Sequence, residues 1–143
     1  MNVTIHIARV TDTLLAGSAL AAVCSEHERP PLLNPDHEPA LRAGLRVVFD
    51  TVALQLAPYI KAVDRAAADE PVLRFVDHIA ADSETVARAV ESVLALRMLH
   101  QLHATAYPAV AAACGTGAAE TLAALHRYIL ARTPSPGRIR PSE

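Results

Sequence analysis

The sequence predicts an all-α protein: a bundle of about four helices, with a possible small β accessory and an extended C-terminal tail. The 143-residue chain is 52% hydrophobic but only 3% aromatic, and it has no tryptophan. Much of its apolar content is alanine, the strongest helix former. Long stretches also show the three-to-four-residue apolar spacing of amphipathic helices. So few aromatic and β-branched residues disfavour a β-sandwich or a barrel.

The first helix is expected over residues 10–25, with Thr11 or Asp12 as its N-cap. Before it, apolar residues alternate over residues 3–7, a pattern typical of a short strand. Residues 26–35 contain paired prolines and are expected to form a loop. The residues expected to form the inner face of the first helix are Val10, Leu14, Ala21 and Cys24, with Leu20 and Val23 beside them.

The second helix carries the strongest amphipathic signal and is expected over residues 36–68. With Asp36 as N-cap, Pro39 takes the third helical position, where its missing N–H costs no hydrogen bond. Pro58 is expected to kink the helix near residues 54–57. The residues that follow the helical spacing are Leu41, Leu45, Val48, Val52, Tyr59 and Val63.

Residues 69–82 give a weaker signal with two interpretations. A short helix or turn is favoured over a strand. The alternative is a strand at 72–78, for which residues 3–7 are the obvious partner. The third helix is expected to begin at Asp82 or Ser83 and to run to about residue 106. Apolar residues cover more than half of its circumference, which predicts a central or interfacial helix.

The fourth helix is expected over residues 108–132. Gly115 and Gly117 predict either a break in this helix or a close approach by a neighbouring element. Residues 1–132 are interpreted as one helical domain. Residues 133–143 contain three prolines and are expected to form an extended or disordered tail.

Composition and charge disfavour several classes of function. The net charge of −2 provides no basic field for nucleic acid, and no basic recognition helix follows an apolar turn, so no sequence-specific nucleic-acid binding is expected. No window approaches the roughly 18 uncharged apolar residues of a membrane span. No cationic segment precedes the first apolar stretch, so a cytoplasmic protein is expected.

No motif in the chain predicts catalysis, and no enzyme activity or cofactor is expected. His100 and His103 lie three residues apart, so both imidazoles could reach one metal ion. Helical-bundle metal sites add carboxylates in Glu-x-x-His patterns, and this chain has no such pattern. The two histidines are therefore only weak candidates for metal ligands. Cys24 and Cys114 are expected to be small packing residues.

Two stretches carry a resemblance to a known class of protein. The second helix is acidic-capped, and its part before the expected kink, residues 36–57, ends in Leu-x-x-Tyr-Ile at residues 56–60. The last helix closes in Leu-His-Arg-Tyr-Ile-Leu-Ala-Arg-Thr-Pro, at residues 125–134, and a tail rich in proline and arginine follows. Together they resemble the small helical head–tail connector, or adaptor, proteins of phages and prophages.

The resemblance implies a structural protein that forms a homo-oligomeric ring between the portal and the tail, and that enters the virion. It also implies that the C-terminal tail, with Arg138, Ile139 and Arg140, binds the portal or other neck and tail proteins. Two alternatives stay open: a helical bundle that binds a metal or a small ligand, and a stand-alone protein-interaction module.

Overall fold

The computed structural model describes residues 1–24 and 31–134 of the chain. It contains four α-helices: α1 (Ile7–Val23), α2 (Glu38–Gln55), α3 (Ser83–His103) and α4 (Pro108–Ala131). Three short strands accompany them: β1 (Asn2–Thr4), β2 (Ile60–Asp64) and β3 (Val72–Phe75). The prediction of four helices is confirmed, and the possible two-stranded β accessory is present as a three-stranded antiparallel sheet.

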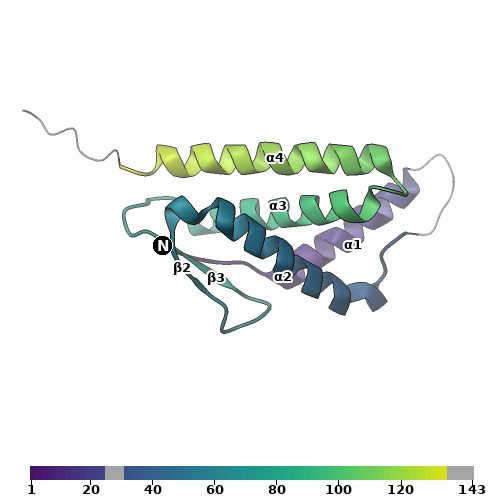
Figure 1. Cartoon of the computed structure of the whole chain (residues 1–143), viewed down its shortest axis with the longest axis horizontal. Helices are drawn as coiled ribbons and strands as arrows, with labels where there is room; N and C mark the ends of the chain where they lie inside the picture. The colour runs from purple at the N-terminus through teal and green to yellow at the C-terminus, as the bar shows by residue number, and fades with distance from the viewer. Residues whose placement is uncertain (25–30, 135–143) are drawn as a thin grey trace, which may run out of the picture.

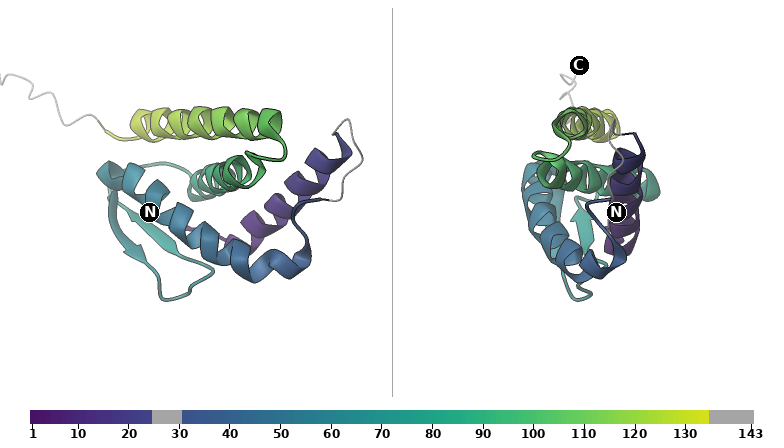
Figure 2. Two further views of the ribbon diagram at one scale, coloured as in Figure 1. Left: turned by 45° about the vertical axis from the view of Figure 1, so that its right-hand side comes forward. Right: turned by 90° about the vertical axis from the view of Figure 1, so that its right-hand side faces the viewer.

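The third helix is the centre of the molecule, as its wide apolar circumference predicted. It packs against α4 on one side and against α1 and α2 on the other (Figure 1). Viewed end-on, α1 and α2 form opposite flanks of the molecule (Figure 2). The most deeply buried large side chains come from α1, α2, α4 and the sheet as well as from α3, and they form one core.

The sheet has the strand order β1-β3-β2, and both pairings are antiparallel. Leu73 is fully buried at its centre, opposite Val3 on one side and Val63 on the other. The favoured helix or turn at 69–82 is therefore wrong for Val72–Phe75, and the alternative pairing with the N-terminus is correct. The predicted strand at residues 3–7 is shorter, because α1 already begins at Ile7.

The predicted kink in the second helix is also wrong, because α2 ends at Gln55. A 3-10 turn over Ala57–Tyr59 follows and leads directly into β2, which was not predicted. Pro58 lacks the N–H that a continuing helix would need, so it ends the helix rather than bending it. Tyr59 and Val63 fit the helical spacing but lie beyond the helix.

Helix starts differ from the predictions in two places. Asn34, and not Asp36, caps the second helical segment: its side chain accepts from the Asp36 N–H at 2.9 Å and begins a short 3-10 turn before α2. The N-cap of α1 is His6, and neither Thr11 nor Asp12. The α3 start is confirmed, because the Asp82 carboxylate accepts from the Thr85 N–H at 2.8 Å.

Helix α4 passes through both of its glycines without a break. A Cβ atom at Gly115 would lie 2.8 Å from Nδ1 of His100, and one at Gly117 would lie 3.4 Å from a methyl carbon of Leu96. Close approach by α3 is thus the correct alternative for Gly115.

Candidate functional site: an unpaired arginine between α2, α3 and α4

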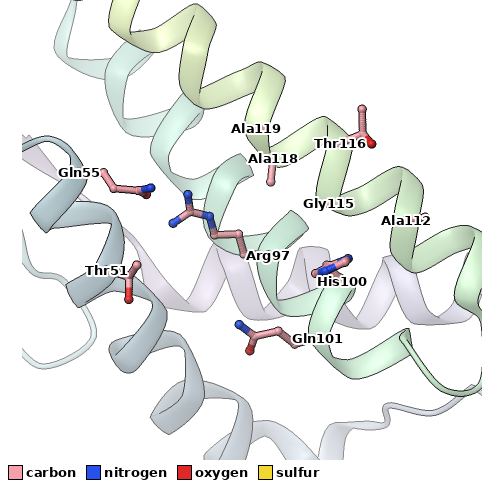
Figure 3. Close-up of a pocket in the computed structure, with 10 residues that line it drawn as sticks. All are labelled: Thr51, Gln55, Arg97, His100, Gln101, Ala112, Gly115, Thr116, Ala118 and Ala119. Atoms are coloured by element: carbon pink, nitrogen blue, oxygen red, sulfur yellow. The ribbon is translucent and has the colours of Figure 1, made fainter.

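A groove of about 720 Å³ opens between α2, α3 and α4. The α4 wall consists of small residues, which keep the groove open, whereas the α2 and α3 walls carry polar side chains (Figure 3). The groove is lined by Thr51, Gln55, Arg97, His100, Gln101, Ala112, Gly115, Thr116, Ala118 and Ala119.

Arg97 is the charged residue of this groove. It is half-buried on α3, and its side chain and that of Gln55 on α2 point toward one another across the groove (Figure 3). Burial lowers the pKa of the Arg97 guanidinium, because partial desolvation disfavours its charged form. An arginine nevertheless stays charged at neutral pH, so an anion in the groove would stabilise Arg97.

The groove does not supply that anion. None of its lining residues is acidic, and within the described ranges Arg97 forms no ion pair or hydrogen bond. Most other arginines of the same ranges do have acidic partners: Arg9, Arg42, Arg46, Arg65, Arg74 and Arg88. A guanidinium flanked by amide and hydroxyl groups can bind a carboxylate or a phosphate from another molecule.

The two weak metal candidates are directed to different places. His100 lines the groove, and its Nδ1 lies 2.7 Å from the Ala111 carbonyl oxygen. His103 is fully buried, with Nδ1 3.2 Å from the Leu99 carbonyl oxygen and its ring against Tyr107. In the part of the chain that the structure describes, no three His, Cys, Asp or Glu residues are grouped so that they could hold a metal ion.

Arg138, Ile139 and Arg140 lie outside the described residues, so their portal-binding role stays a prediction. Cys24 is exposed at the end of α1 rather than packed inside. Cys114 is half-buried, and burial raises the pKa of its thiol.

The helices α1 and α2 each carry two exposed large apolar side chains. On α1, Leu20 and Val23 are 64% and 82% exposed, which corrects their expected place beside the inner face. On α2, Val47 and Leu54 are 67% and 75% exposed. We define the α1 flank as the outward row Asp12, Ala16, Leu20 and Val23, and the α2 flank as the outward row Ala43, Val47, Thr51 and Leu54.

Sequence reasoning missed Arg97 and the two flanks. The available signal was a single arginine inside the apolar stretch 93–99 of the third helix. For α2, Val47 and Leu54 lie off the phase of the buried residues, and this could have been read from the helical spacing.

Within residues 1–24 and 31–134, no helix combines the length and the apolarity that crossing a bilayer requires. No protein-family model, no curated protein and no solved structure matches this chain. The groove and the two flanks are therefore the features that bear on function.

Proposed function

We propose that this chain is a structural assembly protein of a phage or phage-like particle, a head–tail connector or adaptor that forms an oligomeric ring between portal and tail. In this role it acts through its surfaces and has no enzymatic activity. It is made in the cytoplasm of the producing cell and is incorporated into the virion.

The single observation that supports this role is that α1 and α2, which lie on opposite sides of the molecule (Figure 2), each carry an exposed apolar flank. A face that binds a different face of the next copy gives a head-to-tail contact, and head-to-tail contacts close into rings when the rotation between copies allows it. Large exposed apolar side chains on a helix are also typical of protein–protein interaction sites when they are grouped.

The ring is tested by size-exclusion chromatography with multi-angle light scattering, over a roughly hundredfold range of protein concentration. We expect a mass several times 15.2 kDa, either alone or after addition of a portal protein. Leu54→Lys is expected to reduce that mass. Leu130→Lys is the matched control, because Leu130 is 58% exposed on α4 and belongs to neither flank. A monomer under all conditions, portal included, would contradict the ring.

The portal contact has its own test. Replacing Arg138, Ile139 and Arg140 together by alanine is expected to abolish co-purification with the portal and to leave the ring intact. The matched control is Arg127→Ala, which removes an exposed arginine from α4. Equal portal binding by the tail variant and the wild type would contradict the proposed binding of the C-terminal tail to the portal.

One observation favours a second candidate function, a helical bundle that binds a small anion. Arg97 lies unpaired in an open groove with hydroxyl and amide groups around it. Isothermal titration with inorganic phosphate and with citrate tests this candidate directly. Saturable binding by the wild type that Arg97→Gln removes would favour it over the connector, if the same preparation stays monomeric.

A further inference from the structure

The outward rows of the two flanks can be aligned with each other. Ala16 and Leu20 are four residues apart on α1, and Val47 and Thr51 are four residues apart on α2. Both separations correspond to about 6 Å along a helix axis. In an antiparallel pair of helices, Leu20 would therefore face Val47 when Ala16 faces Thr51, and Asp12 would lie level with Gln55, the next groove residue along α2.

In that register, the acidic residue of the α1 flank lies near the cation of the groove beside the α2 flank. Asp12 is exposed on α1 and has no ion pair or hydrogen bond with any described side chain. Gln55 lies in the same groove as Arg97, which likewise has no acidic partner. The Asp12 carboxylate of one copy would thus reach the groove wall beside Arg97 of the next copy. Neither group has an oppositely charged partner among the described residues of its own copy.

We propose that the α1 flank of one copy packs antiparallel along the α2 flank of the next copy, with the Asp12 carboxylate entering the groove and binding the Arg97 guanidinium. This inference rests on the proposed ring function and specifies the contact from which the ring is built. The occupant of the groove is thus a carboxylate from a second copy of this chain.

The chemistry of the contact gives it both direction and register. The apolar pairs remove exposed surface from water, and Leu20 against Val47 is the central one. The ion pair is shielded by the helices around the groove, so a carboxylate and a guanidinium attract each other more strongly there than on an open surface. A shift in register would separate the Asp12 carboxylate from the Arg97 guanidinium and lose their ion pair, which disfavours wrong contacts.

A charge exchange is the first test, measured by sedimentation velocity on the full chain. Asp12→Arg and Arg97→Asp are each expected to weaken self-association about tenfold or more. The double variant restores the ion pair in reverse and is expected to recover most of the lost affinity. Circular dichroism and thermal melts confirm folding, and Arg97→Gln replaces Arg97→Asp if the latter does not fold.

Two matched controls have the same changes of charge at other exposed sites. Glu120→Arg and Arg127→Asp alter residues of α4 that lie outside both flanks, and both variants are expected to associate like the wild type. The inference is overturned if the single variants of the flanks also associate like the wild type. It is equally overturned if the double variant associates no better than the single ones.

A cross-link tests the register itself. The antiparallel arrangement places Cys24, an exposed free thiol at the end of α1, opposite Ala43 of the next copy. Ala43→Cys is therefore expected to give a ladder of disulfide-linked oligomers under mild oxidation. Ala43→Cys combined with Cys24→Ser should lose the ladder, and Ala62→Cys, exposed on β2, should not form it. A ladder of equal yield from Ala62→Cys would contradict the register.

The two proposals fail in different ways. If the wild type stays monomeric even with a portal present, the ring function fails, and the contact fails with it. If the wild type forms oligomers that the charge exchange and the cross-link leave unaffected, only the Asp12–Arg97 contact is wrong. If Arg97→Asp dissociates the oligomer and Asp12→Arg does not, a different carboxylate binds in the groove and the inference is overturned.

Discussion

The Arg9 guanidinium lies 2.9 Å from the Glu91 carboxylate and connects the first turn of α1 to the middle of α3. Glu91 is only 6% exposed, and its carboxylate also accepts the backbone N–H of His6 at 3.3 Å. One buried acid thus receives both a side-chain cation and the N-terminal end of a helix, which carries partial positive charge. It fixes the start of α1 against the central helix.

Replacing Glu91 by glutamine is expected to lower the free energy of unfolding by about 1–3 kcal/mol, because the hydrogen bonds to a buried charged acceptor are lost or weakened. Urea denaturation monitored by circular dichroism measures the change. Glu84→Gln is the control, since Glu84 pairs with Arg9 and Arg88 on an exposed surface, where ion pairs contribute little. Equal losses from the two variants would contradict the structural role of Glu91.

The chain that leads into α2 is held by a second buried contact. The Ser18 hydroxyl of α1 accepts the backbone N–H of Leu33 at 3.1 Å, and both residues are buried. Ser18→Ala is expected to cost about 1–3 kcal/mol, because the Leu33 N–H loses its acceptor. Thr11→Ser is the control. The Thr11 hydroxyl donates to the Ile7 carbonyl oxygen within α1, and serine retains that hydroxyl. The control is expected to lower the free energy of unfolding less than Ser18→Ala does, because it removes only a methyl group. Equal stability of Ser18→Ala and wild type would remove the role assigned to Ser18.

The two glycines of α4 are expected to respond differently to the same substitution. Gly117→Ala should stabilise the protein by about 0.5–1 kcal/mol, because alanine is the better helix former and its Cβ meets Leu96 at an ordinary 3.4 Å. At Gly115 the added Cβ would be 2.8 Å from Nδ1 of His100. The ring must then move and give up its hydrogen bond to Ala111. Gly115→Ala is therefore expected to be the less stable variant in thermal melts, and the reverse order would contradict this packing.

The stability of the protein is expected to fall in acid because of Asp69. Hydrogen bonding from Arg46, together with the charges of Arg42 and Arg46, holds the pKa of the Asp69 carboxyl below its ordinary value. The stabilisation is complete above the unfolded pKa of about 3.9 and is lost as the pH falls through the lower folded pKa.

Asp69→Asn removes this contribution, so the variant should be less stable than the wild type at neutral pH and should lose less stability between about pH 5 and pH 2. Thermal melts across that range measure the effect. Glu120→Gln changes an exposed acid of α4 and is expected to keep the acid dependence of the wild type. If the melting temperatures of Asp69→Asn and the wild type fall in parallel as the pH is lowered, the ion pairs of Asp69 are not the cause of the acid sensitivity.

The helices α3 and α4 could be predicted closely because local chemistry marks their ends. Asp82 caps α3, and Pro108 takes the first position of α4, where a missing N–H costs nothing. The strand β2 could not be predicted in the same way. Tyr59 and Val63 suit the helical spacing as well as a strand, and the partner that decides between them is β3, a separate segment of the chain.

Arg97 illustrates a different limit of prediction. A helical spacing can place it beside the apolar face of α3, but whether an acid faces it depends on how α2 and α4 pack. Leu20 shows the same limit on α1, where its neighbours Ala21 and Ala22 are buried and it is not. Unpaired charges and exposed apolar faces are properties of the assembled fold, so they follow from tertiary structure and not from periodicity.

The sheet has a consequence for the order of folding. Helices α3 and α4 are joined by only four residues, so their pairing closes a short loop, whereas Val3 meets Leu73 only after about 70 residues of chain are brought together. Contacts between distant segments slow folding. We therefore expect the α3–α4 pair to form early and β1 to join β3 late. During synthesis from the N-terminus, Val3 and Ile5 must remain without their partners until the β2–β3 hairpin has emerged.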